Sequence, residues 1–310
     1  MRGCRARAAG KVPPAERNRP MKATLAHYFQ LTKPSIMLLV VFTGTASLVI
    51  EGSLLDRPGR FLLVLLGLYL AGGSANALNQ YFERNIDAQM KRTSGRRPLP
   101  RKQISPAGAL VFSVAIGVLG VAVFALFFNL RTAALALATI LFYSLFYTLY
   151  LKPTTPQNIV IGGIAGAMAP VGAWTAATGA MAVAPWIMFA IVFLWTPPHF
   201  WALALYCKDD YEKVDLPMLP LVKGDRATVD RIFAYTLAVV GASLVLIAFT
   251  AGWFYFAVAA LLGGQFIRRA ARVRREQSVA GYRSLFGYSI VYLFSLFGAM
   301  MADGVLQRWL

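Results

Sequence analysis

Runs of about 20 apolar residues recur along this chain, and they constrain its fold more than any other feature. A helix needs about that length to cross the hydrocarbon core of a bilayer. With 58 % hydrophobic and only 14 % charged residues in 310, the composition excludes an ordinary soluble enzyme. The sequence therefore predicts an all-α polytopic membrane protein with about nine transmembrane helices. The expected spans are residues 34–50, 61–83, 107–128, 132–150, 158–178, 184–206, 232–250, 252–267 and 285–306.

The basic residues predict how these spans are oriented. Short loops that remain in the cytoplasm carry an excess of Lys and Arg. With a cytoplasmic N-terminus, all but four of the 31 basic residues fall on the cytoplasmic side, the exceptions being Arg57, Arg60, Arg131 and Arg308. We therefore expect that topology, and we attribute the net charge of +18 to loops facing lipid headgroups rather than to a surface for nucleic acid.

The first 22 residues are basic, nearly free of acids, and without the apolar core of a secretory signal. We expect a disordered basic tail over 1–22 and a single transmembrane domain over 23–310. A transit peptide, or a translation start at Met21 rather than Met1, is an alternative interpretation of the same segment.

Carboxylates gather where the second apolar run ends. On one helix, Asn79, Glu83 and Asp87 fall within about 80° of one another, so their oxygen atoms share a face. Such a face suits Mg²⁺, which binds through one or two carboxylates together with water and substrate phosphates. Ionisable groups beside lipid are costly unless they face a cavity. The alternative is a helix end that emerges into water, with its acids paired to neighbouring basic residues.

A second acidic cluster follows the sixth run. Eight of the 13 acidic residues lie here or in the first motif, on the same expected side of the membrane. A continuous helix would not bring Asp209, Asp210 and Asp215 together, and Pro217 and Pro220 favour a turn. Alone this is a charged loop, but beside the first motif it suggests a shared metal site. The candidate metal ligands are Asn79, Glu83, Asp87, Asp209, Asp210 and Asp215.

Cations lie near both acidic segments in the sequence. They can neutralise phosphate oxygens that metal ions leave free. The apolar helices beside them suit the other half of an amphiphilic substrate, so the pattern indicates a diphosphate attached to an apolar chain. The metal would be Mg²⁺, with Mn²⁺ as an alternative. The candidate cations are Arg92, Arg96, Arg97, Lys102, Lys152 and Lys208.

Three segments resemble a known family: NQYFERNIDAQMKRTSGRRPLP (79–100), YTLYLKPTTPQNIVIGGIAGAMAPVGAW (147–174) and TPPHFWALALYCKDDYEKVDLPMLP (196–220). They are similar to the haem O synthases, or protohaem IX farnesyltransferases, among the intramembrane prenyltransferases that include the 4-hydroxybenzoate polyprenyltransferases. The resemblance begins near LTKP (31–34) and continues to the last span. It implies helices around a central cavity, with both acidic loops over its cytoplasmic mouth.

The resemblance also implies an activity, the transfer of the farnesyl group of farnesyl diphosphate to a vinyl group of haem B, which gives haem O and diphosphate. Glu83 stands where the wider family usually has Asp, which puts the metal coordination at this position in doubt. The implied location is the inner (cytoplasmic) membrane, and haem A synthesis or a terminal oxidase would follow. The implied catalytic residues are Asn79, Glu83, Asp87 and Asp210, and the implied diphosphate-binding residues are Arg92, Arg97, Lys102, Lys152 and Lys208.

Pro197 and Pro198 should interrupt the sixth helix, and His199 follows them directly. Proline removes a backbone donor, so we expect a bend around the cavity. One hypothesis, which the resemblance supports, is that His199 contacts the iron or the propionates of haem. The alternative is a hydrogen-bonded histidine that steadies the bend.

Two other functions are compatible with the sequence. A prenyltransferase acting on an aromatic quinone precursor would share the metal and diphosphate groups and differ only in its acceptor. An ion-coupled transporter would place its coupling carboxylates near the middle of the membrane. Here the acids cluster at one membrane face, which argues against a transporter.

Overall fold

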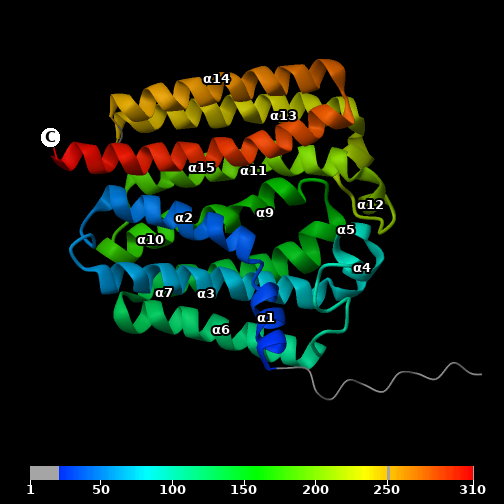
Figure 1. Ribbon diagram of the computed structural model, residues 1–310, viewed down its shortest axis with the longest axis horizontal. Helices are drawn as coiled ribbons and strands as arrows, with labels where there is room; N and C mark the ends of the chain where they lie inside the picture. Colours follow the sequence, from blue (N-terminus) through cyan, green and yellow to red (C-terminus); the bar gives the residue numbers. More distant parts are fainter. Residues whose placement is uncertain (1–20, 250–251, 310) are drawn as a thin grey trace, which may run out of the picture.

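The computed structural model describes residues 21–249 and 252–309, and every regular element in this part of the chain is a helix (Figure 1). Residues 1–20, which include most of the expected basic tail, lie outside the described part, and residues 21 and 22 already belong to the first helix. The helices are α1 (Met21–Leu31), α2 (Pro34–Glu51), α3 (Pro58–Phe82), α4 (Arg84–Gln89), α5 (Lys91–Ser94), α6 (Pro106–Phe127), α7 (Leu130–Leu141), η1 (Phe142–Leu151), α8 (Lys152–Thr154), α9 (Asn158–Ala167), α10 (Ala169–Thr178), α11 (Val183–Tyr206), α12 (Lys208–Glu212), α13 (Leu219–Val245), η2 (Leu246–Ala248), α14 (Trp253–Glu276) and α15 (Val279–Trp309).

Eight candidate membrane spans are present in the described residues. They correspond to eight of the nine expected runs, with α7, η1 and α8 forming one span and α9 and α10 another. The ninth run lies in α14, a 24-residue helix at the edge of the bundle that packs against α13 and α15 (Figure 1). After Ile267 this helix carries five arginines, so its apolar part is too short to qualify by composition.

The long helices lie roughly parallel, and they bury two main apolar cores. The larger core joins α11, α13, α14 and α15, with fully buried side chains such as Trp201, Tyr292 and Phe297. The smaller core lies among α2, α3, α6, α7 and α10 around Leu68 and Phe124. Contacts of α2 with α15 and of α9 with α11 join the two halves.

The short helices α4, α5 and α12 gather at one end of the bundle, where α3 and α11 also end (Figure 1). Helix α12 comes from the second acidic segment, which is a short helix followed by a turn rather than a turn alone. The two predicted acidic loops therefore lie at the same end, as the sequence predicts.

Two helices differ from the sequence prediction. Helix α11 continues through Pro197 and Pro198, where the sequence predicts an interruption. Segment η1 is a π-helix of ten residues, and π-helical turns commonly occur at functional sites. The wider turn lets Thr148 donate a 2.8 Å hydrogen bond to the carbonyl of Tyr143, five residues earlier.

Candidate active site

Asn79, Glu83 and Asp87 lie together where α3 passes into α4. The helix is not continuous: α3 ends at Phe82, and Glu83 leaves the helical conformation. The backbone N–H of Glu83 still donates to the carbonyl of Asn79, and that of Asp87 to the carbonyl of Glu83. These bonds preserve the four-residue spacing across the break, so the predicted shared face survives. The three residues are 2 %, 4 % and 1 % exposed.

Each of these three side chains pairs with a cation from elsewhere in the chain. Lys33 donates a 2.7 Å hydrogen bond to Oδ1 of Asn79. Lys152 forms an ion pair with Glu83, and Arg97 forms one with Asp87. Nη1 of Arg97 also lies 3.8 Å from Oε2 of Glu83. Three partly buried cations and three buried oxygen-bearing side chains therefore form one cluster, which we call the polar cluster below.

The charges in the polar cluster oppose the cost of burial. Burial raises the pKa of Glu83, but the charges of Lys152, Lys33 and Arg97 outweigh it and hold the pKa below its usual value. For Asp87, burial and the adjacent Glu83 carboxylate raise the pKa, and pairing with Arg97 offsets only part of the rise. Burial and the charge of Arg97 lower the pKa of Lys33 well below its usual value.

Lys33 is the member of the cluster that the sequence analysis missed. It precedes α2 and has a left-handed backbone conformation (φ 53°), with Pro34 opening the helix. That conformation is unusual for a residue other than glycine, and strained backbone often marks a functional position. The only signal in the sequence was its place in LTKP, 46 residues before its partner Asn79.

The second acidic segment contributes Asp210. Its Oδ2 accepts a 3.0 Å hydrogen bond from the backbone N–H of Arg92, which ties α12 to α5. The Arg92 guanidinium lies over the ring of Tyr211, 5.8 Å from its centroid. Lys213 lies 4.0 Å from Oδ1 of Asp210. Asp210 and Arg92 therefore join the two motifs at the rim of the bundle.

The other candidates lie farther out. Asp209 and Asp215 are exposed, and so is Lys102. Lys208 pairs with Asp225 at 2.7 Å rather than with the polar cluster. Within residues 21–249 and 252–309, no three His, Cys, Asp or Glu side chains lie close enough together to hold a metal ion. The six candidate ligands thus form two groups, and a metal shared by both remains a prediction.

His199 precedes Tyr206, the last residue of α11, by seven residues, which is about 10 Å along the helix axis. Its Nδ1 is 2.7 Å from Oγ of Ser289 on α15. This hydrogen bond fits the alternative in which His199 is a structural residue that steadies the helix. A contact of His199 with haem stays a prediction.

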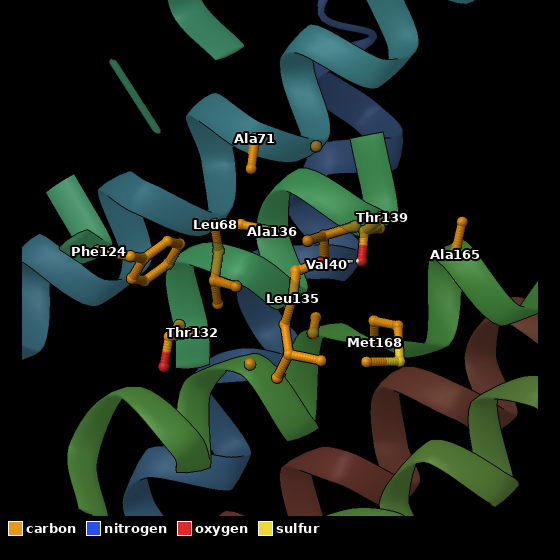
Figure 2. A pocket seen from close by; sticks show the side chains of 13 residues that line it. Val40, Leu68, Ala71, Phe124, Thr132, Leu135, Ala136, Thr139, Ala165 and Met168 are labelled. Atoms are coloured by element: carbon orange, nitrogen blue, oxygen red, sulfur yellow. Dashed lines mark hydrogen bonds between the residues drawn. The ribbon is translucent and has the colours of Figure 1, made fainter. Parts of the chain in front are cut away.

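An apolar pocket lies among the membrane-spanning helices (Figure 2). Its lining comes from α2, α3, α6, α7, α9 and α10. The empty space between the lining atoms, with the open mouth included, is about 500 Å³. Gly72, on its wall, precedes Asn79 by seven residues, or about 10 Å along α3. Phe124 lies at the opposite end of the pocket from Ala165 (Figure 2) and is fully buried. The pocket is lined almost entirely by apolar side chains and glycines.

Residues 39–295 match the model of the UbiA prenyltransferase family. The chain belongs to the UbiA prenyltransferase family. This membership confirms the resemblance to intramembrane prenyltransferases, and it rests on more than half of the sequence.

Curated relatives within the UbiA family are similar over nearly the whole chain. A protoheme IX farnesyltransferase from Gloeobacter violaceus is 47 % identical over 294 residues, which cover 94 % of this chain and 96 % of that protein. One from a Picosynechococcus species is 46 % identical over 288 residues, with 91 % and 90 % covered. One from Alkalilimnicola ehrlichii is 46 % identical over 289 residues, with 91 % and 94 % covered.

Solved structures of UbiA-type proteins share the fold at lower identity. A digeranylgeranylglyceryl phosphate synthase superimposes with a TM-score of 0.76 at 19 % identity, covering 91 % of this chain and 99 % of that one. A UbiA homologue from Archaeoglobus fulgidus, bound to GPP and Mg²⁺, gives 0.57 at 15 % identity, with 88 % and 99 % covered. These similarities confirm the predicted all-α, multi-pass membrane fold.

Proposed function

We propose that this chain transfers the farnesyl group of farnesyl diphosphate to a vinyl group of haem B, giving haem O and diphosphate. The observation that carries this proposal is the 46–47 % identity to protoheme IX farnesyltransferases over at least nine-tenths of both lengths. In the reaction, the bond between C1 of the farnesyl group and the diphosphate oxygen breaks. The vinyl carbon bonds to C1, and one water molecule completes the hydroxyethylfarnesyl substituent.

The polar cluster has the donor chemistry for Mg²⁺ on a diphosphate. Mg²⁺ in phosphate-transfer sites binds through one or two carboxylates and the substrate phosphates rather than an all-protein cage. Glu83 and Asp87 supply two buried carboxylates, and Asn79 and Asp210 supply further oxygens. When bound, Mg²⁺ would neutralise negative charge on the diphosphate. UbiA homologues with Mg²⁺ and a prenyl diphosphate bound support this assignment.

The cations of the cluster stabilise the leaving diphosphate. Arg97 and Lys152 already pair with the carboxylates, and Lys33 with the amide oxygen of Asn79, so all three cations are in place before substrate arrives. Negative charge builds on the leaving oxygen as the bond to C1 breaks, and positioned cations act most strongly at that stage. Arg92 stands at the rim beside Asp210 and completes this set. Lys102 and Lys208 would reach the diphosphate only if the rim rearranges, since one is exposed and the other pairs with Asp225.

The apolar pocket is the proposed place of the farnesyl chain. Without the open mouth, its cavity volume is about 70 Å³, below the range of roughly 300–1,000 Å³ that is usual for ligand pockets, so a farnesyl chain would bind there only if the lining side chains move apart. Gly72, on its wall, precedes Asn79 of the polar cluster by seven residues on α3, so the pocket lies within about 10 Å of the proposed diphosphate site along that helix. Apolar walls also keep water from the allylic carbon until the vinyl group attacks.

The membrane side and the acceptor complete the proposal. The excess of basic residues supports a position of the polar cluster and its loops on the cytoplasmic side of an inner membrane, with the N-terminus also inside. His199 is the proposed contact to the haem, which would enter between the helices. Enzymes that convert haem O to haem A, or a terminal oxidase that takes up haem O, would use the product.

Haem extraction from cells tests this function. Cells that express the protein should contain a haem with the mass of the farnesylated product, and cells with an Asp87→Asn variant should not. A prenylated quinone precursor in place of a new haem would establish the alternative acceptor. No new haem species in cells with the wild-type protein would overturn the proposal.

A further inference from the structure

His199 is held between two aromatic rings. Its ring centroid lies 4.3 Å from that of Trp195 with planes 19° apart, and 4.5 Å from that of Phe286 with planes 26° apart. Phe200 meets the ring nearly at right angles, with centroids 5.0 Å apart. Because both faces of the imidazole are covered, a large planar ligand cannot stack on it. Only an edge of the ring remains for contact.

The partner of Nδ1 fixes the position of the imidazole proton. Ser289 has one hydroxyl hydrogen, and Oγ donates it to the carbonyl of Phe286 at 2.7 Å. Toward Nδ1 of His199, also 2.7 Å away, Oγ can then only accept. The hydrogen-bond network therefore assigns the proton to Nδ1. A neutral imidazole with Nδ1–H carries its lone pair on Nε2.

His199 leaves α11 on the side that faces the junction between the two halves of the molecule. On α11, Trp195 faces α15, because its Nε1 donates to the carbonyl of Ser289 at 2.7 Å. Thr196 faces α9, because a Cβ added at Gly163 would lie 3.1 Å from it. His199 is about 40° from Trp195 and about 60° from Thr196 around the helix, so it lies between these two directions.

Nε2 is available at this junction. Among the residues that the structure describes it has no hydrogen-bond partner, and it is not one of the fully enclosed polar atoms. His199 as a whole is 7 % exposed. The uncovered part of the side chain thus includes the nitrogen that bears the lone pair.

We propose that Ser289 is a positioning residue, which holds His199 as the Nδ1–H tautomer so that Nε2 presents its lone pair to the iron of the haem substrate. The inference rests on the proposed function for the identity of the ligand. Metal-bound histidines usually donate their second N–H to an oxygen acceptor that orients the ring. Here that acceptor belongs to α15, so the packing of α11 on α15 sets the direction of the lone pair.

The tautomer can be measured without haem. The chain has two histidines, so protein labelled with ¹⁵N in the imidazole rings gives a spectrum that a His27→Gln variant assigns. We expect a directly bonded proton on Nδ1 of His199 and none on Nε2. In Ser289→Ala, the Nδ1–H tautomer of His199 should no longer be the main form of the ring. An Nε2–H tautomer in the wild type, or an unchanged tautomer in Ser289→Ala, would overturn the inference.

Haem binding tests the second step. Ferric haem B added to the purified protein without farnesyl diphosphate should show the absorption spectrum of an imidazole-ligated haem, and His199→Ala should lose it. Ser289→Ala should keep that spectrum but bind about 10- to 100-fold more weakly, and Ser289→Thr should recover part of the loss. Ser243→Ala, a variant of another fully buried serine, should bind as the wild type does. An imidazole-type spectrum in His199→Ala, or equal affinities of Ser289→Ala and Ser243→Ala, would contradict the proposal. Absence of haem O synthesis by the wild type would instead refute the proposed function and leave the tautomer result standing.

Discussion

Replacing Lys33 by methionine should separate activity from stability. The Lys33 ammonium is partly buried and lies 2.7 Å from Oδ1 of Asn79, and burial lowers its pKa. Burying a charge opposes folding, so a methionine of similar length should leave the melting temperature unchanged or raise it. The same change removes one of the cations beside the diphosphate. Loss of one positioned donor at developing charge costs about 2.7–4 kcal/mol, or roughly 10²- to 10³-fold in kcat.

The assay is haem O formation by purified Lys33→Met, with the melting temperature measured on the same preparation. Lys33→Arg retains a charge and should recover part of the rate. Lys223→Met makes the same chemical change at an exposed lysine and should behave as the wild type. Turnover of Lys33→Met within tenfold of the wild type would refute the catalytic role. A low rate accompanied by a falling melting temperature would show that Lys33 is structural.

Three further predictions concern the pocket and the polar cluster. Phe124→Leu should shorten the side chain at the end of the pocket and raise kcat/KM for geranylgeranyl diphosphate relative to farnesyl diphosphate; an unchanged ratio would show that Phe124 does not limit chain length. Asp87→Asn, and separately chelation of divalent cations, should abolish turnover, and activity in the Asn variant would remove Asp87 from the metal site. In Gly162→Val, the new Cβ would lie 2.4 Å from the Tyr147 ring. The clash should lower the melting temperature, because overpacked cores lose about 1–3 kcal/mol of stability. An unchanged melting temperature would show that α9 and η1 separate at no cost.

Much of the site could be predicted because its central residues are close in the sequence. Asn79, Glu83 and Asp87 are four residues apart, and helical geometry places such residues on one face. That prediction survives the break at Glu83 because two backbone hydrogen bonds continue across it. The apolar runs predict the spans for the same reason, since each is a local property of the chain.

Contacts between distant segments could not be predicted in this way. Lys33 meets Asn79 across 46 residues, and Lys152 meets Glu83 across 69. Lys208 was expected at the diphosphate but pairs with Asp225, because the turn after α12 brings the start of α13 back toward it. Such pairings depend on how whole helices pack, and no local spacing encodes them.

Proline chemistry led to a wrong expectation about α11. Proline lacks a backbone donor, which usually ends or kinks a helix. In α11 the pair Pro197 and Pro198 lies inside a helix that is buried on several sides and packs against α9, α13 and α15. Tertiary packing of this kind can hold a helix together where the local sequence favours a break.

The most direct test of the account is product analysis after incubation of the purified protein with farnesyl diphosphate, Mg²⁺ and haem B, with 4-hydroxybenzoate in a parallel reaction. Mass spectrometry should detect the hydroxyethylfarnesyl haem and an equal amount of diphosphate in the first reaction, and no prenylated product in the second. Prenylated 4-hydroxybenzoate without haem O would contradict the central claim that haem B is the acceptor.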